Sequence, residues 1–202
     1  ESVEKDKIVG IDPEIAQLIA DDLGMELEIE DMAFDSIIAA VQSGKADIAM
    51  AGMTVTEDRK ENINFSDPYT TAAQVILVKN TSSVKSPDDL TGLTIGVQIG
   101  TTGDIYAEDI EGATIERYSK YFEAINSLAQ DKIDAVIVDR EPGKVFVSEN
   151  PDLIMIDEEF TVEEYAIGVA KENTELLDNI NTSLKKLQDS GKIDEIIGKY
   201  IK

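Results

Sequence analysis

The alternation of helix-like and strand-like apolar patterns most constrains what this chain can fold into. In the first half, helical spacing over residues 15–23 is followed by a strand-like segment at 27–29, a helical segment at 35–43 and an apolar strand at 47–53. The second half predicts strands at residues 74–79, 94–99, 114–118, 135–139, 153–156 and 165–170, and helices from 104 and at 121–130, 141–148, 174–188 and 193–201. Alternating β and α elements predict a mainly parallel sheet covered by helices on both faces.

Residues 42–52 resemble residues 129–139. Each segment ends a helix, continues through a Lys-x-Asp turn and enters an apolar strand, although a match this short also arises by chance. If the repeat is real, it predicts two α/β lobes built alike, with Gly52 and Asp139 at corresponding strand ends. Ligands of open α/β sheets bind beyond the carboxyl ends of the strands. Two such lobes facing each other would bring one set of residues to a common cleft: Gly52, Arg59, Thr102 and Asp139.

Residues 51–59 join the end of an apolar strand to an expected helix start. Gly52 allows a ligand to approach the backbone closely. Thr54-x-x-Glu57 has the spacing of a capping box, and Arg59 offers a planar fork that matches a carboxylate. We therefore expect this stretch to bind a small carboxylate. The alternative is an ordinary turn with an exposed arginine.

The second half supplies complementary groups. Residues 100–103 form a loop whose N–H groups can join Arg59 on a carboxylate, and Asp139 can accept an ammonium group. Together these groups suit an α-amino acid. The loop lacks the Lys-Ser/Thr ending of a P-loop, which argues against nucleotide binding. The alternatives are a simple turn at 100–103 and a helix N-cap at Asp139.

Composition excludes several function classes. The net charge of −24, from 42 acidic and 18 basic residues, disfavours binding to nucleic acid or to an anionic membrane. The absence of cysteine and histidine excludes disulfides, thiolate catalysis, histidine triads and histidine-type metal sites. No apolar run is long enough to span a bilayer and no signal peptide is present. We therefore expect either a cytosolic protein or a processed or recombinant mature chain.

Motifs from end to end of the chain carry a resemblance to a known family. They are Gly10-Ile11-Asp12, residues 42–47, residues 51–59, residues 65–69, Gly100-Thr101-Thr102 and residues 134–139. This ordered set resembles the polar amino acid-binding proteins of ABC importers. The resemblance implies an α/β fold of two Rossmann-like lobes joined by a two-crossover hinge, the type II periplasmic binding protein fold. Lobe 1 would be residues 1–68 and 166–202, lobe 2 residues 74–160, and the hinge residues 69–73 and 161–165.

The resemblance also implies a role for each matching residue. Arg59 would bind the α-carboxylate with the N–H groups of Thr54 and Thr102. Asp139 would bind the ammonium group, with the Gly52 carbonyl and the Thr54 hydroxyl. The ligand side chain would meet Phe34, Ala51, Gln98 and Thr101. On the residues alone, Phe34 is as readily explained as a core residue, and Asp67 and Tyr69 are expected to shape a turn.

The function implied is that of a monomeric receptor that is not an enzyme, uses no cofactor or metal and passes a free amino acid to ABC transporter permease subunits. Gln98 and residues 100–103 are similar to those of arginine, lysine or histidine receptors, and glutamine remains an alternative. Such receptors occupy the periplasm or the outer face of the membrane. The same fold also serves as a sensor domain of signalling receptors and, rarely, as a dehydratase-like enzyme, for which Asp139 is the available acid or base. Family members usually open with a strand and an aromatic-containing loop, and the resemblance leads us to expect that Glu1 corresponds to a position after both.

Overall fold

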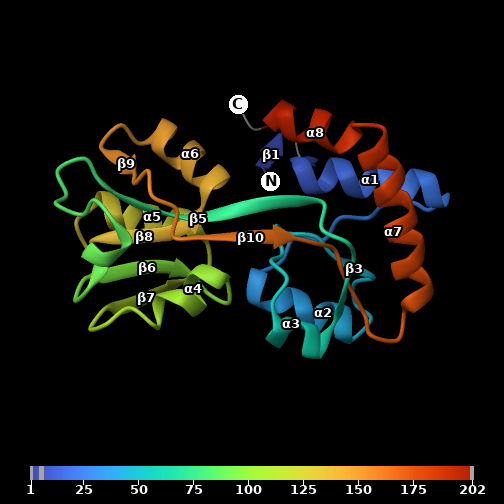
Figure 1. Ribbon diagram of the computed structural model, residues 1–202, viewed down its shortest axis with the longest axis horizontal. Helices are drawn as coiled ribbons and strands as arrows, with labels where there is room; N and C mark the ends of the chain where they lie inside the picture. The colour runs from blue at the N-terminus through green and yellow to red at the C-terminus, as the bar shows by residue number, and fades with distance from the viewer. Residues whose placement is uncertain (1, 5–6, 201–202) are drawn as a thin grey trace. The chain divides into compact units, whose positions relative to one another are not determined.

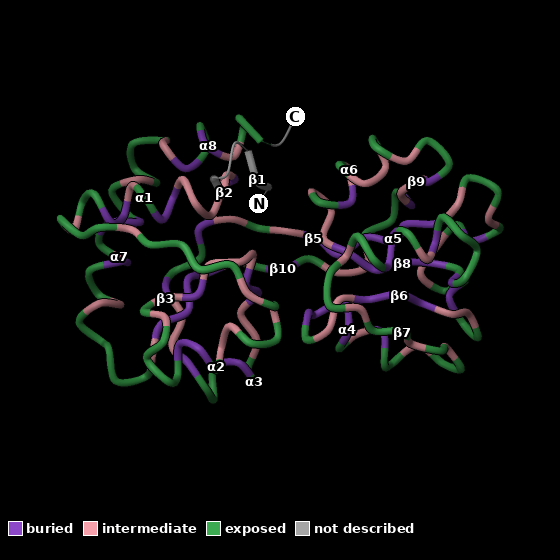
Figure 2. The backbone as a smooth tube through the Cα atoms, turned by 180° about the vertical axis from the view of Figure 1, so that it is seen from behind, coloured by how far each residue is buried: buried purple, intermediate pink, exposed green. Residues whose placement is uncertain are grey.

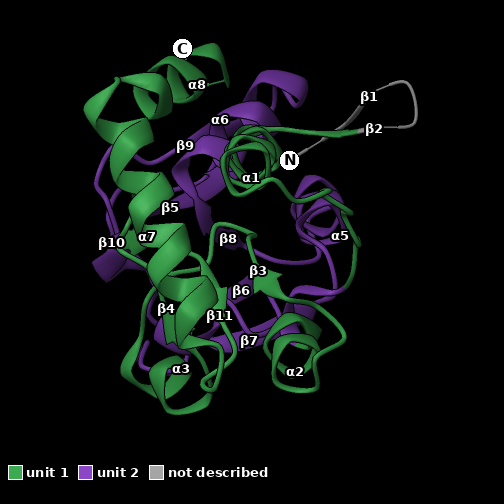
Figure 3. Ribbon diagram, turned by 90° about the vertical axis from the view of Figure 1, so that its right-hand side faces the viewer, with its two compact units in different colours: residues 1–32, 36–71, 164–202 green, residues 33–35, 72–163 purple. Residues whose placement is uncertain are grey.

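The computed structural model describes residues 2–4 and 7–200, which form helices and strands of an α/β protein (Figure 1). The chain divides into two compact units (Figure 3). Unit 1 comprises Glu1–Met32, Ser36–Thr71 and Glu164–Lys202, and unit 2 comprises Ala33–Asp35 and Ala72–Glu163. The main crossings therefore fall after Thr71 and after Glu163.

The sheet of unit 2 has the strand order β10-β5-β8-β6-β7, with β9 also paired to β5. Its strands are β5 (Thr70–Lys79), β6 (Thr94–Gln98), β7 (Thr114–Tyr118), β8 (Ala135–Asp139), β9 (Leu153–Met155) and β10 (Thr161–Tyr165). β6 is parallel to β7 and β8, whereas β5 is antiparallel to β8 and β9. Helices link β6, β7 and β8, as parallel neighbours require. The mainly parallel prediction is correct for these three strands only, because β5 is joined to them by no such crossover.

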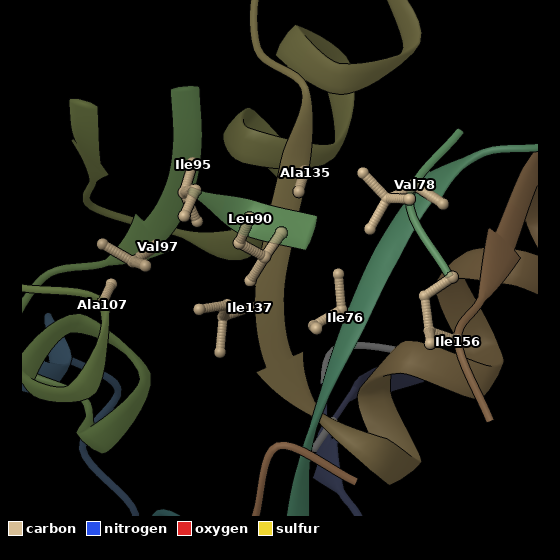
Figure 4. Packing of buried hydrophobic residues seen from close by; sticks show 10 residues of the cluster. Ile76, Val78, Leu90, Ile95, Val97, Ala107, Ala135, Ile137 and Ile156 are labelled. Carbon is tan, nitrogen blue, oxygen red and sulfur yellow. The ribbon is translucent and has the colours of Figure 1, made fainter. Parts of the chain in front are cut away.

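Both faces of the central strands of this sheet are buried. Ile76, Ile95 and Ile137 point to one side, where Ala107 of α4 (Thr102–Ala107) joins them (Figure 4). The alternate residues pack on the other side with α5 (Tyr121–Ala129) and α6 (Arg140–Glu149). The single-turn helix η2 (Pro87–Leu90) adds Leu90 to the first core. Because both faces are covered, β6 and β8 are almost wholly buried (Figure 2).

Unit 1 contains a three-stranded sheet with β11 (Gly168–Val169) at its centre. The strands β3 (Ile48–Ala49) and β4 (Asn64–Phe65) both run antiparallel to β11, so the parallel prediction is wrong here. The return of the chain from unit 2 places β11 between two earlier strands in the opposite direction. One core joins β11 to three helices: α1 (Ile11–Leu23), α7 (Thr174–Asp189) and α8 (Lys192–Tyr200).

The remaining elements of the chain are short. They are β1 (Ser2–Glu4), β2 (Lys7–Val9), η1 (Phe34–Ser36), α2 (Ile37–Gln42) and α3 (Glu57–Asn62). β1 and β2 form an antiparallel pair. Among residues 2–4 and 7–200, no helix has the length and apolar character needed to cross a membrane.

Several local predictions are wrong in detail. Residues 27–29 form no strand, because alternation alone does not supply a hydrogen-bonding neighbour. The strand predicted at 47–53 is paired only at Ile48–Ala49. Thr54 does not cap a helix, since α3 begins after Thr56, whose hydroxyl accepts from the Arg59 N–H. The last predicted helix extends to Ile201, which lies outside the described residues.

The internal repeat has a structural counterpart at two helix ends. Gly44 after α2 and Asp131 after α5 hold matching positions, and both have positive φ, 71° and 57°. In each case the next residue donates its N–H five residues back: Lys45 to Ala40 (2.9 Å) and Lys132 to Ser127 (3.0 Å). This is the left-handed helix ending that glycine favours and that aspartate tolerates. The two segments therefore share a backbone conformation as well as a sequence pattern.

Candidate functional site

Arg59 is the buried residue of an otherwise exposed helical turn. The neighbouring positions 57, 58, 60, 61 and 62 of α3 are exposed, whereas Arg59 is only 7% exposed. This burial is unusual, because arginine is rarely buried without a partner. Its guanidinium Nη1 donates to the Thr54 carbonyl (2.7 Å). The alternative of an exposed arginine at an ordinary turn is therefore wrong.

Thr54 presents its backbone to Arg59. It forms an antiparallel bridge with Tyr165, but the hydrogen bonds of that bridge belong to the flanking residues. They are Val55 N–H to the Glu164 carbonyl (3.1 Å) and Ala166 N–H to the Met53 carbonyl (3.1 Å). At such a position the N–H and carbonyl of the central residue point away from the partner strand. The Thr54 N–H therefore faces the same side as the Arg59 guanidinium.

Gly52 is fixed by the carboxylate of Asp12, which belongs to the motif Gly10-Ile11-Asp12. Its φ of 55° suits glycine, and an added Cβ would meet the Tyr165 ring at 3.2 Å. The Gly52 N–H and the Tyr69 hydroxyl both donate to Asp12, at 2.7 Å each. Burial raises the pKa of Asp12, and these two hydrogen bonds oppose that shift only in part. Because a trans peptide directs its N–H and carbonyl oppositely, the Ala51 carbonyl points away from Asp12.

Residues 51, 52, 54 and 59 thus come together in unit 1, and we call Ala51, Gly52, Thr54 and Arg59 the arginine set. Tyr69 was expected to shape a turn; it is also 4% exposed and anchors Asp12. No simple sequence signal indicates that pairing, since the two residues are 57 positions apart.

Asp139 ends β8 in unit 2 and occupies the N-cap position of α6. Its side chain makes no capping hydrogen bond, so the N-cap alternative does not explain the carboxylate. Instead, Asp139 Oδ1 accepts from the Gln74 side-chain amide on the adjacent strand. Gln74 and Asp139 are direct partners in the register of β5 and β8.

Gln74 connects Asp139 to two further residues. Its Nε2 lies 3.2 Å from Glu163 Oε2 and 3.4 Å from Thr102 Oγ1. The Thr102 hydroxyl also donates to Glu163 Oε2 (2.8 Å). Gln74, Thr102 and Glu163 are 1%, 2% and 5% exposed. We call Gln74, Thr102, Asp139 and Glu163 the Gln74 network; the sequence reasoning missed Gln74 and Glu163.

The loop before α4 holds Gln98 and Thr101 in fixed positions. The Thr101 hydroxyl donates to the Gln98 carbonyl (2.9 Å) and accepts from the Asp104 N–H (3.3 Å), which caps α4. The Gln98 amide donates to the Ser119 carbonyl (3.0 Å). The helix therefore begins at Thr102, two residues before the predicted start at Asp104.

Phe34 belongs to unit 2 and starts the turn η1. It is partly buried and is not among the buried core residues, so the core alternative does not describe it. The adjacent Asp35 lies close to the loop, because a Cβ added at Gly100 would stand 3.2 Å from Asp35 Cβ. Unit 2 therefore brings Phe34 to the side of this loop.

The pKa of Tyr121 reflects the negative charge around the Gln74 network. Burial raises its pKa, and the negative charges of Asp139, Glu163 and Asp104 act in the same direction. Arg117 balances part of this charge through an ion pair with Asp104 (2.8 Å). Within the described residues, no group of three His, Cys, Asp or Glu side chains is arranged to hold a metal ion.

The family model for bacterial extracellular solute-binding proteins, family 3, matches residues 1–202. The chain belongs to this family. A solute-binding protein of this kind is a binding protein rather than an enzyme, and the type II periplasmic binding protein fold of its relatives is the fold of this chain.

Among its relatives, the arginine-binding extracellular protein ArtP of Bacillus subtilis is 32% identical over 98% of this chain and 79% of its own. The P235GK mutant of ArgBP from T. maritima is 42% identical, with a TM-score of 0.93 over 98% of this chain and 87% of the other. An ancestral arginine-binding protein, solved with arginine, is 39% identical, with a TM-score of 0.93 over 100% of this chain and 92% of the other. An ancestral arginine-binding protein solved with glutamine is also 39% identical, with a TM-score of 0.91 over 99% of this chain and 91% of the other.

Proposed function

We propose that this solute-binding protein binds a free L-amino acid with a basic side chain and delivers it to the permease subunits of an ABC importer. It would do so as a monomer, in the periplasm or at the outer face of a cell membrane. The observation that carries the proposal is the buried Arg59 guanidinium beside the backbone edge of Thr54. A buried guanidinium with adjacent N–H donors is suited to a carboxylate.

In this proposal the two sets of residues bind the two charged groups common to every amino acid. Arg59 takes the α-carboxylate, together with the N–H groups of Thr54 and Thr102. Asp139 takes the ammonium group, with the Gly52 carbonyl and the Thr54 hydroxyl. The ligand side chain contacts Phe34, Ala51, Gln98 and Thr101.

The preference for a basic side chain has two supports. First, Asp104, Asp139 and Glu163 give the neighbourhood of Tyr121 a negative potential. Second, the named relatives include arginine-binding proteins, and ancestral arginine-binding proteins have been solved with arginine and with glutamine. Glutamine therefore serves as the neutral comparison of similar length.

A thermal-shift screen of the twenty amino acids tests the proposal. A ligand present at 100 times its Kd stabilises the folded protein by about 2.7 kcal/mol, which is a readily measured shift. We expect arginine, lysine or histidine to give the largest shift, and ligand recovered after incubation to be chemically unchanged. If no amino acid stabilises the protein, the proposed function is wrong. Stimulation of a permease ATPase only by the ligand-loaded protein would test delivery.

A further inference from the structure

Two strands of unit 2 carry polar residues where apolar ones are expected. In β10, Val162 is 64% exposed while the adjacent Glu163 is 5% exposed. In β5, Gln74 is 1% exposed and is continuous with the buried run 75–78. Buried polar side chains cost stability unless they are hydrogen-bonded, so such reversals commonly mark functional positions.

The orientation of the Gln74 amide is set by charge. Its nitrogen faces Asp139 Oδ1 and Glu163 Oε2, whereas its oxygen lies against Gly103, 3.1 Å from where a Cβ would stand. The opposite orientation would place the amide oxygen against two carboxylates. An NH₂ group carries two protons, so one amide can hold one oxygen of each carboxylate at the same time.

Glu163 therefore acts on Asp139 through Gln74. Glu163 Oε2 also accepts the Thr102 hydroxyl (2.8 Å), so Thr102 and Gln74 fix the position of this carboxylate. Removing the charge of Glu163 would leave Asp139 as the one carboxylate that directs the Gln74 NH₂, so the amide would be held less firmly. Asp139 would also lose part of the negative potential behind it.

We propose that Glu163 is a positioning residue for the recognition of the ligand ammonium group: through Gln74 it orients Asp139 and adds a second negative charge behind it. This inference rests on the proposed function, because it takes Asp139 as the group that binds the ammonium. The ligand class it favours is amino acids with a free, charged α-amino group, over acids that lack one.

The test compares L-arginine with 5-guanidinopentanoic acid, which is arginine without its α-amino group, by calorimetry on the wild type and on Glu163→Gln. The substitution keeps the shape of the side chain and removes its charge. We expect the preference for arginine over the des-amino acid to fall about tenfold, an effect within the usual coupling of residues in one hydrogen-bond network. Glu164→Gln is the matched control, because Glu164 is the next residue of β10 and is exposed; its preference should equal that of the wild type.

A double-mutant cycle separates positioning from a general structural role. In an Asp139→Asn background, Glu163→Gln should cause a smaller loss of preference than in the wild type, because its effect through Gln74 on Asp139 is already gone and only its own charge remains to be lost. Equal weakening of both ligands, an unchanged preference, or the same loss in both backgrounds would overturn the inference. If Glu163→Gln does not fold, the same two ligands are compared on Glu163→Asp, which keeps the charge but shortens the reach to Gln74. Its preference for arginine over the des-amino acid should also fall. Failure of the wild type to bind any amino acid would instead overturn the proposed function.

Discussion

The arginine set and the Gln74 network present opposite charges and are built differently. In unit 1, one cationic side chain is held by a backbone carbonyl, and the neighbouring groups belong to a turn and a bridge. In unit 2, carboxylates stand on strands of a buried sheet and are joined by side-chain hydrogen bonds. The arginine set therefore depends on one charge and on backbone shape. The Gln74 network distributes its negative charge over several side chains, so it should tolerate single substitutions better.

Arg59→Ala is the strongest test of this difference. We expect loss of measurable amino acid binding, at least about 30-fold, because truncating one partner of a buried charge pair costs about 2 to 5 kcal/mol. Arg59→Lys should also bind poorly, since it keeps the charge but loses the planar fork. Calorimetry with arginine measures both.

Lys60→Ala is the matched control for Arg59, because Lys60 is the next residue of α3 and is exposed. Its affinity should equal that of the wild type. Tight binding of arginine by a folded Arg59→Ala protein would show that Arg59 does not bind the ligand carboxylate.

Asp139→Asn should have a smaller effect, on the order of tenfold in affinity, because Glu163 keeps a negative charge close by. The variant should also discriminate less between an amino acid and its des-amino analogue. Calorimetry with the two ligands measures this, with Asp157→Asn as a control at an exposed position. A loss of affinity as large as that of Arg59→Ala would contradict the idea that the negative charge of the Gln74 network is distributed over several side chains.

Most of the fold can be predicted from the sequence, because periodicity determines which residues are buried. The strands 114–118 and 135–139 match β7 and β8 residue for residue. What periodicity cannot supply is pairing partners. It predicts a strand at 27–29, where none forms, and a parallel sheet in unit 1, where β11 returns antiparallel. Direction in a sheet depends on where the chain re-enters, which is not a local property.

For the site, sequence reasoning finds residues that belong to continuous motifs and misses those that meet only in three dimensions. Arg59 and Asp139 follow apolar strands and are recognisable. Glu163 and Gln74 are 89 positions apart and become neighbours only through the pairing of β10 with β5. The sequence does carry a signal for Gln74, namely a glutamine next to an apolar run. For Glu163 it carries none, because its burial beside the exposed Val162 is visible only in the structure.

The dependence of the arginine set on backbone shape predicts a pH effect at Asp12, which holds the Gly52 turn. Burial raises the pKa of Asp12 above 3.8, its ordinary value. The folded state thus favours the protonated form, so the contribution of Asp12 to stability is complete below the unfolded pKa and is lost as pH rises through the folded pKa. Relative to Asp12→Asn, the wild type should therefore become more stable as pH falls from 7 toward 4.

Urea denaturation of the two proteins across this range measures the difference, and Asp194→Asn provides an exposed carboxylate on α8 as control. A difference that shrinks as pH falls would mean that hydrogen bonds from Gly52 and Tyr69 outweigh burial.

The smallest expected effect on affinity is at Tyr121, which is close to Asp139 and Glu163 of the Gln74 network. Because burial and neighbouring carboxylates raise its pKa, the phenol stays neutral and adds no charge to the network. Tyr121→Phe keeps the ring beside Phe146, with centroids 6.5 Å apart, so affinity should change by less than about threefold. In an ultraviolet titration up to about pH 11, the wild type and the variant should show the same rise in phenolate absorbance. Ordinary tyrosines ionise near pH 10, whereas the raised pKa of Tyr121 keeps it neutral over this range. A large loss of affinity would show that the hydroxyl itself takes part in binding, and the Gln74 network would then depend on a neutral donor as well as on its carboxylates.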